Sequence, residues 1–204
     1  MDLKTYSNEK IVEMIKLGEV GARELTDSGI CPTCFNKDNG YVLYGDISDK
    51  ILYEDDDIEC FLVGNPRANG HCAISTKKHY KDMMDIDDEI CKKVFLFSKK
   101  VMNLIKEIYN SESVYLCTMC DGPMNHFHVQ LIPRYSFEKR GSKNFVKERF
   151  DYVYDQDKVE ELRERLNVWY VFLMYRKIID LFVELFIVKK YYFDKSMYTK
   201  KNRI

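Results

Sequence analysis

Hydrophobic and polar positions alternate in several short runs of the chain and follow a helical period in longer ones. Six short runs are candidate strands, at residues 41–45, 50–54, 58–63, 71–76, 114–119 and 125–133. Apolar residues at helical spacing predict one helix over residues 8–26 and a longer one from the acidic segment at 85–89 to about residue 109. Several short strands with one long helix before the last two are typical of an α+β fold with an antiparallel sheet.

The segment beyond residue 137 has a different character. Residues 138–149 are basic and predict a loop that leads into a short helix, whereas residues 157–193 are the most apolar stretch. Charged side chains interrupt residues 168–188, so no run reaches the roughly 18 apolar residues of a membrane-spanning helix. We expect this helix to pack on the domain or on a second copy in a dimer, rather than on a membrane surface.

Net charge and cysteine content indicate which partners and which cellular compartment to expect. The 204 residues carry 32 Lys+Arg and 33 Asp+Glu, for a net charge of -1, so we expect no specific nucleic-acid partner. The first twenty residues have scattered charges and no apolar core, unlike a signal peptide. Seven cysteines without an export signal indicate a reducing compartment, and we expect a cytoplasmic protein whose paired cysteines bind metal.

The strand predicted at 125–133 carries an unusual polar row. His126, His128 and Gln130 share one face, because alternate residues of a strand point to the same side. Such a row is costly on a half-buried strand unless a ligand, a metal or a reaction occupies it. The alternative is a solvent-facing strand whose histidines have no function.

Two Cys-x-x-Cys motifs are candidate metal or redox sites. Cys31 and Cys34 flank a proline in a predicted tight turn, a spacing that suits either zinc or a redox pair. Cys117 lies within a predicted strand, where residues three apart face opposite sides, so Cys117 and Cys120 are read as core or site-wall residues. Histidines would then complete a zinc site, and the chain has four: His71, His79, His126 and His128.

Three segments in order resemble the histidine triad (HIT) superfamily of nucleotide hydrolases and transferases. They read CPTC, then ILYEDDDIECFLVGNPRANGHCAISTKKHYKDMMDIDDE, then NHFHVQLIPRY. Their ordered recurrence is far more specific than any single motif. The resemblance implies a HIT-like antiparallel sheet with one long central helix at 31–137, a helical extension at 1–30, and a basic loop with a C-terminal helical extension at 138–204. Because HIT-like proteins are commonly dimers, it also favours a homodimer.

The resemblance gives each histidine a role. It implies a structural zinc ion without an open coordination position, held by Cys31, Cys34, His79 and His126. His128 matches the family's nucleophile, which would attack the α-phosphorus of a nucleotide and form a nucleotidyl-histidine for water or another acceptor to resolve. His71 matches a position beside the nucleotide.

Departures from the family pattern concern the substrate. Gln130 replaces the third histidine, as in the branches of galactose-1-phosphate uridylyltransferase and diadenosine polyphosphate phosphorylases. Gln130 and backbone amides near Gly122 could hydrogen-bond the non-bridging phosphate oxygens. Val63 or Gly64 replaces the acidic residue that usually holds the ribose. The candidate substrate-binding residues are Asn65, Gly122, Asn125 and Arg134. Residues 138–149 either wrap a polyphosphate, through Arg134, Arg140 and Lys143, or form a solvated basic loop.

Three function classes follow. The favoured one is an enzyme, a nucleotide hydrolase or nucleotidyltransferase that reacts through His128 and acts on a nucleotide or another phosphorylated small molecule. A zinc-stabilised nucleotide-binding module without turnover is the alternative, which the altered ribose position would suit. The third is a zinc-ribbon-like interaction protein whose histidines serve only as ligands.

Overall fold

The structure, a computed structural model, describes residues 1–43, 48–119, 122–151 and 153–168. The chain divides into two units, Met1–Arg163 and Glu164–Ile204. The apolar segment predicted to pack or to dimerise, residues 168–188, lies outside the described residues from position 169 on. Within the described part of the chain, no helix is long and apolar enough to cross a membrane.

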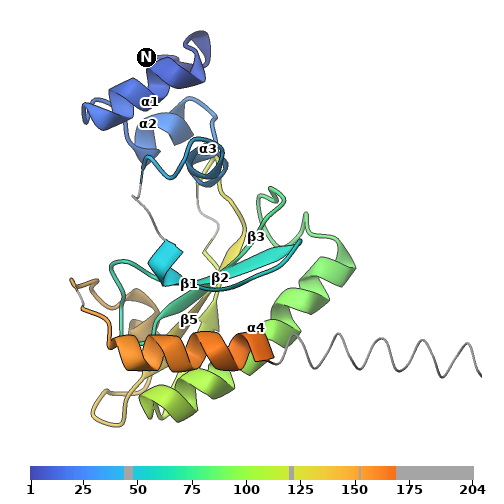
Figure 1. Ribbon diagram of the computed structural model, residues 1–204, viewed down its shortest axis with the longest axis vertical. Coiled ribbons are helices and arrows are strands. Elements are labelled where there is room, and N and C mark those ends of the chain that lie inside the picture. The colour runs from blue at the N-terminus through green and yellow to red at the C-terminus, as the bar shows by residue number, and fades with distance from the viewer. Residues whose placement is uncertain (44–47, 120–121, 152, 169–204) are drawn as a thin grey trace, which may run out of the picture. The chain divides into compact units, whose positions relative to one another are not determined.

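Five antiparallel strands form one sheet in the order β1-β2-β3-β5-β4 (Figure 1). The strands are β1 Ile51–Glu54, β2 Ile58–Leu62, β3 Cys72–Thr76, β4 Ser113–Cys117 and β5 His128–Arg134. Five of the six predicted runs are therefore strands, and the α+β architecture with an antiparallel sheet is confirmed. Of the sixth run, residues 41–43 are not a strand, and residues 44–45 lie outside the described part.

One face of this sheet packs against the long helix α4, Asp88–Tyr109. Val129 and Leu131 of β5 are buried, at 1% and 0% exposure, and they alternate with His128 and Gln130 on the opposite face. The helix ends where Asn110 adopts a left-handed conformation, with φ of 54°. The sheet thus has one packed face, and its other face carries the polar row.

The N-terminal part is made of three short helices rather than one. The helix predicted over residues 8–26 is divided into α1 Asn8–Lys16 and α2 Ala22–Asp27, because Gly18 takes φ of +75° and ends the helical path. The predicted tight turn at Cys31 is instead the start of α3, Pro32–Asp38. Proline suits the first helical position, where the missing N–H would have no partner. The three helices share a small core, made of Leu3, Ile11, Met14, Val20, Leu25 and Phe35.

The basic segment after the sheet lies alongside the loop that connects β2 to β3. A short 3-10 helix, Ser142–Val146, comes first, as the sequence predicted. Residues 147–151 and 153–154, called the strap below, then lie along residues 63–67. Four hydrogen bonds join the two segments: Arg67 to the Lys147 carbonyl, Arg149 to the Asn65 carbonyl, the Phe150 N–H to the Pro66 carbonyl, and the Tyr154 hydroxyl to the Val63 carbonyl. A further helix covers residues 156–168.

Candidate functional site

Four side chains predicted to bind zinc form one cluster. Cys31 and Cys34 come from the start of α3, His79 from the loop after β3, and His126 from the segment before β5, and their ligand atoms all lie within 4.8 Å of one another. The Cys34 Sγ atom is 3.4 Å from Nδ1 of both His79 and His126, and the Cys31 Sγ atom is 3.7 Å from Nδ1 of His126. A tetrahedral zinc with bonds of about 2.3 Å to sulfur and about 2.0 Å to nitrogen separates such atoms by about 3.5 Å. The spacing fits zinc.

The protonation states of the cluster fit zinc as well. His126 Nε2 lies 2.7 Å from the Thr76 carbonyl, which can only accept, so Nε2 holds the proton and the Nδ1 lone pair faces the sulfurs. Burial lowers the pKa of His126 to about 4 and keeps the ring neutral at pH 7. Burial, followed by the neighbouring Cys31, raises the pKa of Cys34 to about 12, so a cation is needed to hold the thiolates. A divalent metal supplies that charge, and the cluster can hold a zinc ion.

His128 has one ring nitrogen held and the other available. Its Nδ1 lies 3.0 Å from the His126 carbonyl, and since a carbonyl can only accept, Nδ1 carries the proton. The lone pair is therefore on Nε2, and the ring is only partly buried. The backbone carbonyl that fixes the tautomer is that of His126. This arrangement leaves a neutral, nucleophilic nitrogen.

Gln130 lies next to His128 Nε2, and His71 lies next to Gln130. The Gln130 amide nitrogen is 3.4 Å from His128 Nε2, to which it can only donate. His71 is fully buried, and its Nδ1 accepts from the Arg67 N–H at 3.0 Å, so its proton is on Nε2. Neither that N–H nor the Gln130 Oε1 atom has another hydrogen-bond partner among the described residues. The two atoms are a complementary donor and acceptor, so the amide can link His71 to His128.

Burial also sets the charge of His71. Its pKa is lowered to about 3, first by burial and then by the positive charges of Arg149, Arg67 and Lys147. The imidazole is therefore neutral at pH 7. The nearby Gln130 side chain acts in the opposite direction and raises the pKa.

The sheet register shows what else shares the face of His128. Ser75 of β3 is directly opposite His128, and Glu59 of β2 is directly opposite Ser75, so the three side chains form a row across the sheet. Cys117 is opposite Gln130 in the next row, which places its side chain beside the site, as expected of a site-wall cysteine. Cys120 lies outside the described residues.

A cavity of about 570 Å³ opens on this same face. Its walls come from α3 and the residues after it, from β2 and its following loop, and from the strap; they are Thr33, Asn36, Lys37, Tyr41, Lys50, Glu59, Phe61, Leu62, Val63, Gly64, Asn65 and Arg149. Lys37 and Glu59 form a largely buried ion pair in the wall, at 2.8 Å. Neighbouring strands are about 4.8 Å apart, so the row from Glu59 to His128 spans about 10 Å, the scale of a nucleoside.

The four expected substrate-binding residues fall in different places. Asn65 lines the cavity, and Asn125 donates from its side chain to the Lys81 carbonyl at 2.6 Å. Gly122 follows two residues that the structure does not describe. Arg134 is six residues from His128 along β5, about 20 Å at 3.3 Å per residue, and its guanidinium binds Glu112 at 2.8 Å. The structure does not bring Arg134 to His128, and we assign it no substrate role.

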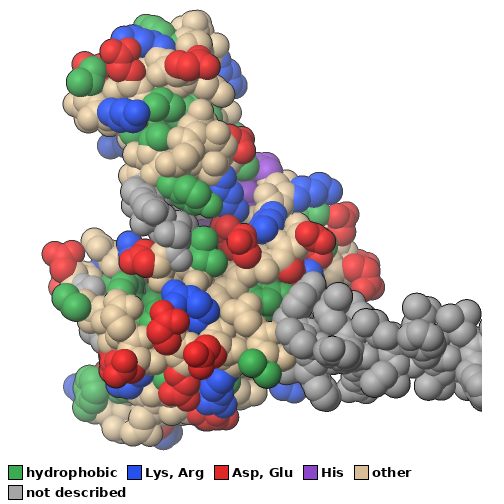
Figure 2. Space-filling view, in the orientation of Figure 1, with side chains coloured by type: hydrophobic (Ala, Val, Ile, Leu, Met, Phe, Trp, Pro, Cys, Tyr) green, Lys and Arg blue, Asp and Glu red, His purple; other side chains and the backbone are tan. Residues whose placement is uncertain are grey.

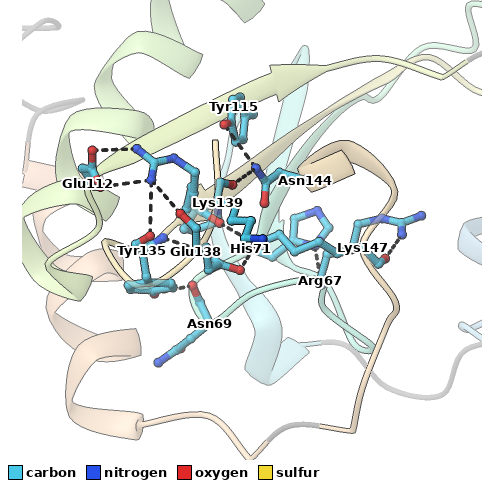
Figure 3. A network of polar contacts seen from close by, with 12 residues as sticks. Arg67, Asn69, His71, Glu112, Tyr115, Tyr135, Glu138, Lys139, Asn144 and Lys147 are labelled. Carbon is cyan, nitrogen blue, oxygen red and sulfur yellow. Dashed lines mark hydrogen bonds and ion pairs between the residues drawn. The ribbon is translucent and has the colours of Figure 1, made fainter. Parts of the chain in front are cut away.

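Other charged residues of the site were not predicted, because they lie in segments without a recognisable sequence motif. Arg67, His71 and Lys147 lie together in the polar network of Figure 3, although Arg67 and Lys147 are 80 positions apart. Lys37 lies about one turn after Cys34 on α3. If the sequence CPTC had been interpreted as the start of a helix, Lys37 would have been predicted beside the cysteines. For Lys147 and Arg149 the sequence gives only the basic character of residues 138–149, and for Arg67, in the loop between β2 and β3, it gives no signal. Figure 2 shows basic and acidic side chains interspersed over the visible face, and histidine reaching its surface.

Comparison with known proteins gives matches to one family. The HIT domain family matches residues 44–137. An uncharacterized HIT-like protein of Methanocaldococcus jannaschii is 32% identical over 126 residues, which cover 60% of this chain and 93% of the relative. A HIT-like protein of Borreliella burgdorferi is 32% identical over 110 residues, covering 48% of this chain and 79% of the relative.

Solved structures of HIT proteins are also similar. A zinc-bound histidine triad family protein from Mycobacterium smegmatis has a TM-score of 0.48 and 18% identity, over 58% of this chain and 84% of that one. A HIT family protein from Bacillus anthracis has a TM-score of 0.45 and 23% identity, over 67% of this chain and 94% of that one.

Proposed function

The chain belongs to the histidine triad (HIT) family, and from this premise we propose that it is a nucleotide hydrolase or nucleotidyltransferase that reacts through a covalent nucleotidyl-His128 intermediate. The observation that carries the proposal is the state of His128. Its Nδ1 proton is held by the His126 carbonyl, at 3.0 Å, while Nε2 keeps its lone pair on the face that bears the cavity. A neutral imidazole is a good nucleophile for phosphorus and a good leaving group afterwards.

The reaction takes two steps. The His128 Nε2 lone pair forms a bond to the α-phosphorus, and the bond from that phosphorus to the leaving group breaks, with the electron pair going to the leaving group. The Nδ1 proton stays on the ring throughout, because the His126 carbonyl holds it. Water or another acceptor then attacks the phosphorus, its proton passes to the solvent, and the electron pair of the N–P bond returns to Nε2.

Gln130 takes part as a positioning and hydrogen-bonding group. With its oxygen facing the His71 N–H, its amide nitrogen is directed to His128 Nε2 at 3.4 Å. When Nε2 becomes bonded to phosphorus, the same N–H group can turn to a non-bridging phosphate oxygen and stabilise its charge. Because an amide cannot deliver a proton as an imidazolium can, Gln130 favours transfer to an acceptor over hydrolysis.

The cavity supplies room for the nucleoside. Phe61 provides an aromatic wall on the same face as Gln130, since both are opposite Ala73 in the sheet register. Val63 and Gly64 line the cavity at the position where the family usually has an acidic residue for the ribose. The polar wall is instead the pair of Lys37 and Glu59. A nucleoside in this cavity would therefore contact the Lys37–Glu59 pair instead of the family's usual acidic residue.

Zinc has a structural role in this proposal. The cluster joins α3 to the segment before β5, and four protein ligands leave no position open for a substrate. His126 contributes to both sites, since its ring faces the cluster and its carbonyl holds His128. A bound zinc therefore fixes the backbone on which the nucleophile is mounted.

The proposal also covers the cellular location, the oligomeric state and the domain boundaries of the protein. We propose a cytoplasmic location, because thiolate ligands such as Cys31 and Cys34 persist in reducing compartments. We propose a homodimer, as is common among HIT-like proteins, and light scattering on the purified chain would measure the mass. The division of the chain at residues 30 and 137 is also a proposal.

An intact-mass measurement tests the function. The purified protein and His128→Asn are exposed briefly to dinucleoside polyphosphates, nucleoside phosphoramidates and nucleotide sugars. We expect an acid-labile nucleotidyl adduct on the wild type alone, with a mass that names the nucleotide. Zinc content serves as the folding control for the variant. An adduct on both proteins would exclude His128 as the nucleophile. Nucleotide affinity without adduct or product would instead support a zinc-stabilised nucleotide-binding module without turnover.

A further inference from the structure

The strap brings positive charge to the loop between β2 and β3. Arg149 donates to the Asn65 carbonyl at 2.8 Å, and the Arg67 guanidinium donates to the Lys147 carbonyl. Lys147 in turn reaches Glu138, at 2.5 Å, and the Pro133 carbonyl. Three cationic side chains are thus collected from two segments, and only the loop segment belongs to the part of the chain that matches the family.

Two of these three cations have no counter-charge among the residues that the structure describes. Lys147 is paired with Glu138, whereas neither Arg67 nor Arg149 forms an ion pair with a carboxylate of the described residues. The Nε–H of Arg67 is buried and has no acceptor within the same part of the chain. Partial burial and repulsion by Arg67 lower the pKa of Arg149. Two guanidinium groups that repel each other and keep free donors are arranged to receive an anion.

These charges lie next to the proposed reaction site. The backbone N–H of Arg67 binds His71, and His71 faces Gln130, which contacts His128. Arg149 forms part of the cavity wall on the same face of the sheet. The positive charges of Arg149, Arg67 and Lys147 are close enough to the His71 ring to lower its pKa, so they lie on the side of His71 away from Gln130 or beside it, near the reaction site.

We propose that Arg67 and Arg149, with Lys147 beside them, bind a second phosphate group adjacent to the phosphorus that reacts with His128. This inference rests on the proposed function and names the substrate class of that site: a phosphoanhydride or a phosphate co-substrate. When Nε2 bonds to the α-phosphorus of an anhydride, the Pα–O bond breaks and its electron pair goes to the departing phosphate oxygen. The charge that develops there is next to the guanidinium groups, which stabilise it.

A comparison of two substrates with the same nucleoside and α-phosphate tests the proposal. One is a dinucleoside polyphosphate, whose leaving group begins with a phosphate, and the other is a nucleoside phosphoramidate, whose leaving group is an uncharged amine. The rate of adduct formation on His128 is measured in single turnovers for the wild type, Arg149→Gln and Arg67→Gln. We expect both variants to slow the polyphosphate reaction about tenfold to a hundredfold and to leave the phosphoramidate reaction within about twofold.

Lys106→Gln is the matched control, because Lys106 is an exposed cation of α4, the helix that packs on the opposite face of the sheet. It should leave both rates unchanged. Equal slowing of the two substrates by Arg149→Gln would show a merely structural role, and unchanged rates with both substrates would show that the arginines bind no phosphate; either result overturns the proposal.

The second phosphate belongs either to the leaving group or to a phosphate co-substrate, and a second experiment distinguishes these two sources. Inorganic phosphate is added to the preformed adduct, and the loss of the adduct is followed. If the phosphate is the acceptor, this rate rises to saturation in the wild type and loses its dependence on phosphate in Arg149→Gln. If it belongs to the leaving group, phosphate has no effect on the rate, and the substrate comparison alone shows the arginine effect.

Binding of inorganic pyrophosphate tests the site independently of the reaction. Calorimetry should show one pyrophosphate bound by the wild type and by Lys106→Gln, with affinity that falls as salt is added. Affinity should be at least about tenfold weaker in Arg149→Gln. If no substrate forms an adduct but this difference is found, the proposed function fails while the phosphate site stands. Equal binding by all variants would contradict the site itself.

Discussion

Acid should destabilise this protein through His71, and the variant His71→Asn isolates the effect. The ring is fully buried between the Arg67 N–H and Gln130, and burial, then Arg149 and Arg67, lower its pKa from the ordinary 6.5 to about 3. As the pH falls below 6.5, the unfolded chain binds a proton at this position and the folded chain does not. Stability from this group is therefore complete above about pH 6.5 and is lost progressively down to pH 3.

The two pKa values give the size of the loss. At pH 4.5 the unfolded state gains RT ln(1 + 10^2) from protonation, about 3 kcal/mol, and the folded state gains almost nothing. At pH 7 the corresponding gain is far below about 1 kcal/mol. Acidification from pH 7 to 4.5 should therefore remove about 2–3 kcal/mol of unfolding free energy through His71 alone.

Urea unfolding at the two pH values measures this loss. In His71→Asn, the amide oxygen can still accept from the Arg67 N–H, but the side chain does not titrate. Other acid-sensitive groups, including His126 and the cysteine ligands, are the same in both proteins, so their contribution cancels in the difference. The wild type should lose about 2–3 kcal/mol more than the variant. A difference below about 0.5 kcal/mol, in this variant and in His71→Gln, would refute a neutral buried His71.

Three other predictions test the metal cluster, the sheet core and the site amide. Cys34→Ala should reduce zinc from about one ion per chain to near zero, measured by elemental analysis, with a lower thermal midpoint; an unchanged zinc content would contradict the ligand set. Leu131→Ala, at a position with 0% exposure on β5, should cost about 2–5 kcal/mol of unfolding free energy in urea, and a cost below about 1 kcal/mol would show that this face is not tightly packed. Gln130→Leu should slow adduct formation at least about tenfold with zinc content retained, and an undiminished rate would remove the amide from the mechanism.

The parts of the fold that local periodicity encodes were predictable. Five of the six runs predicted as strands are strands in the structure, and the long helix predicted from its apolar spacing is confirmed as α4. The assembly of Cys31, Cys34, His79 and His126 was predicted only through the family resemblance, since no local pattern joins residues 31 and 126. The division of the N-terminal helix was missed because apolar spacing outweighed Gly18, whose left-handed backbone ends α1.

The charged surroundings of the site depend on long-range packing that no sequence period reports. Arg67 meets the strap across 80 positions, and Lys37 meets Glu59 between a helix and a strand. Arg134 illustrates the opposite case. Its closeness to the signature in sequence suggested a place in the site, yet six extended residues carry it along β5 to Glu112.

The central claim is that His128 attacks through Nε2 because Nδ1 is held as a donor to the His126 carbonyl. Phosphorus NMR of the denatured adduct, formed with the substrate that the mass measurement identifies, distinguishes the two ring nitrogens. Tryptic mapping of the same sample locates the modified histidine. The account predicts a single phosphorus bonded to Nε2 of His128. A phosphorus on Nδ1, or on another residue, would contradict it.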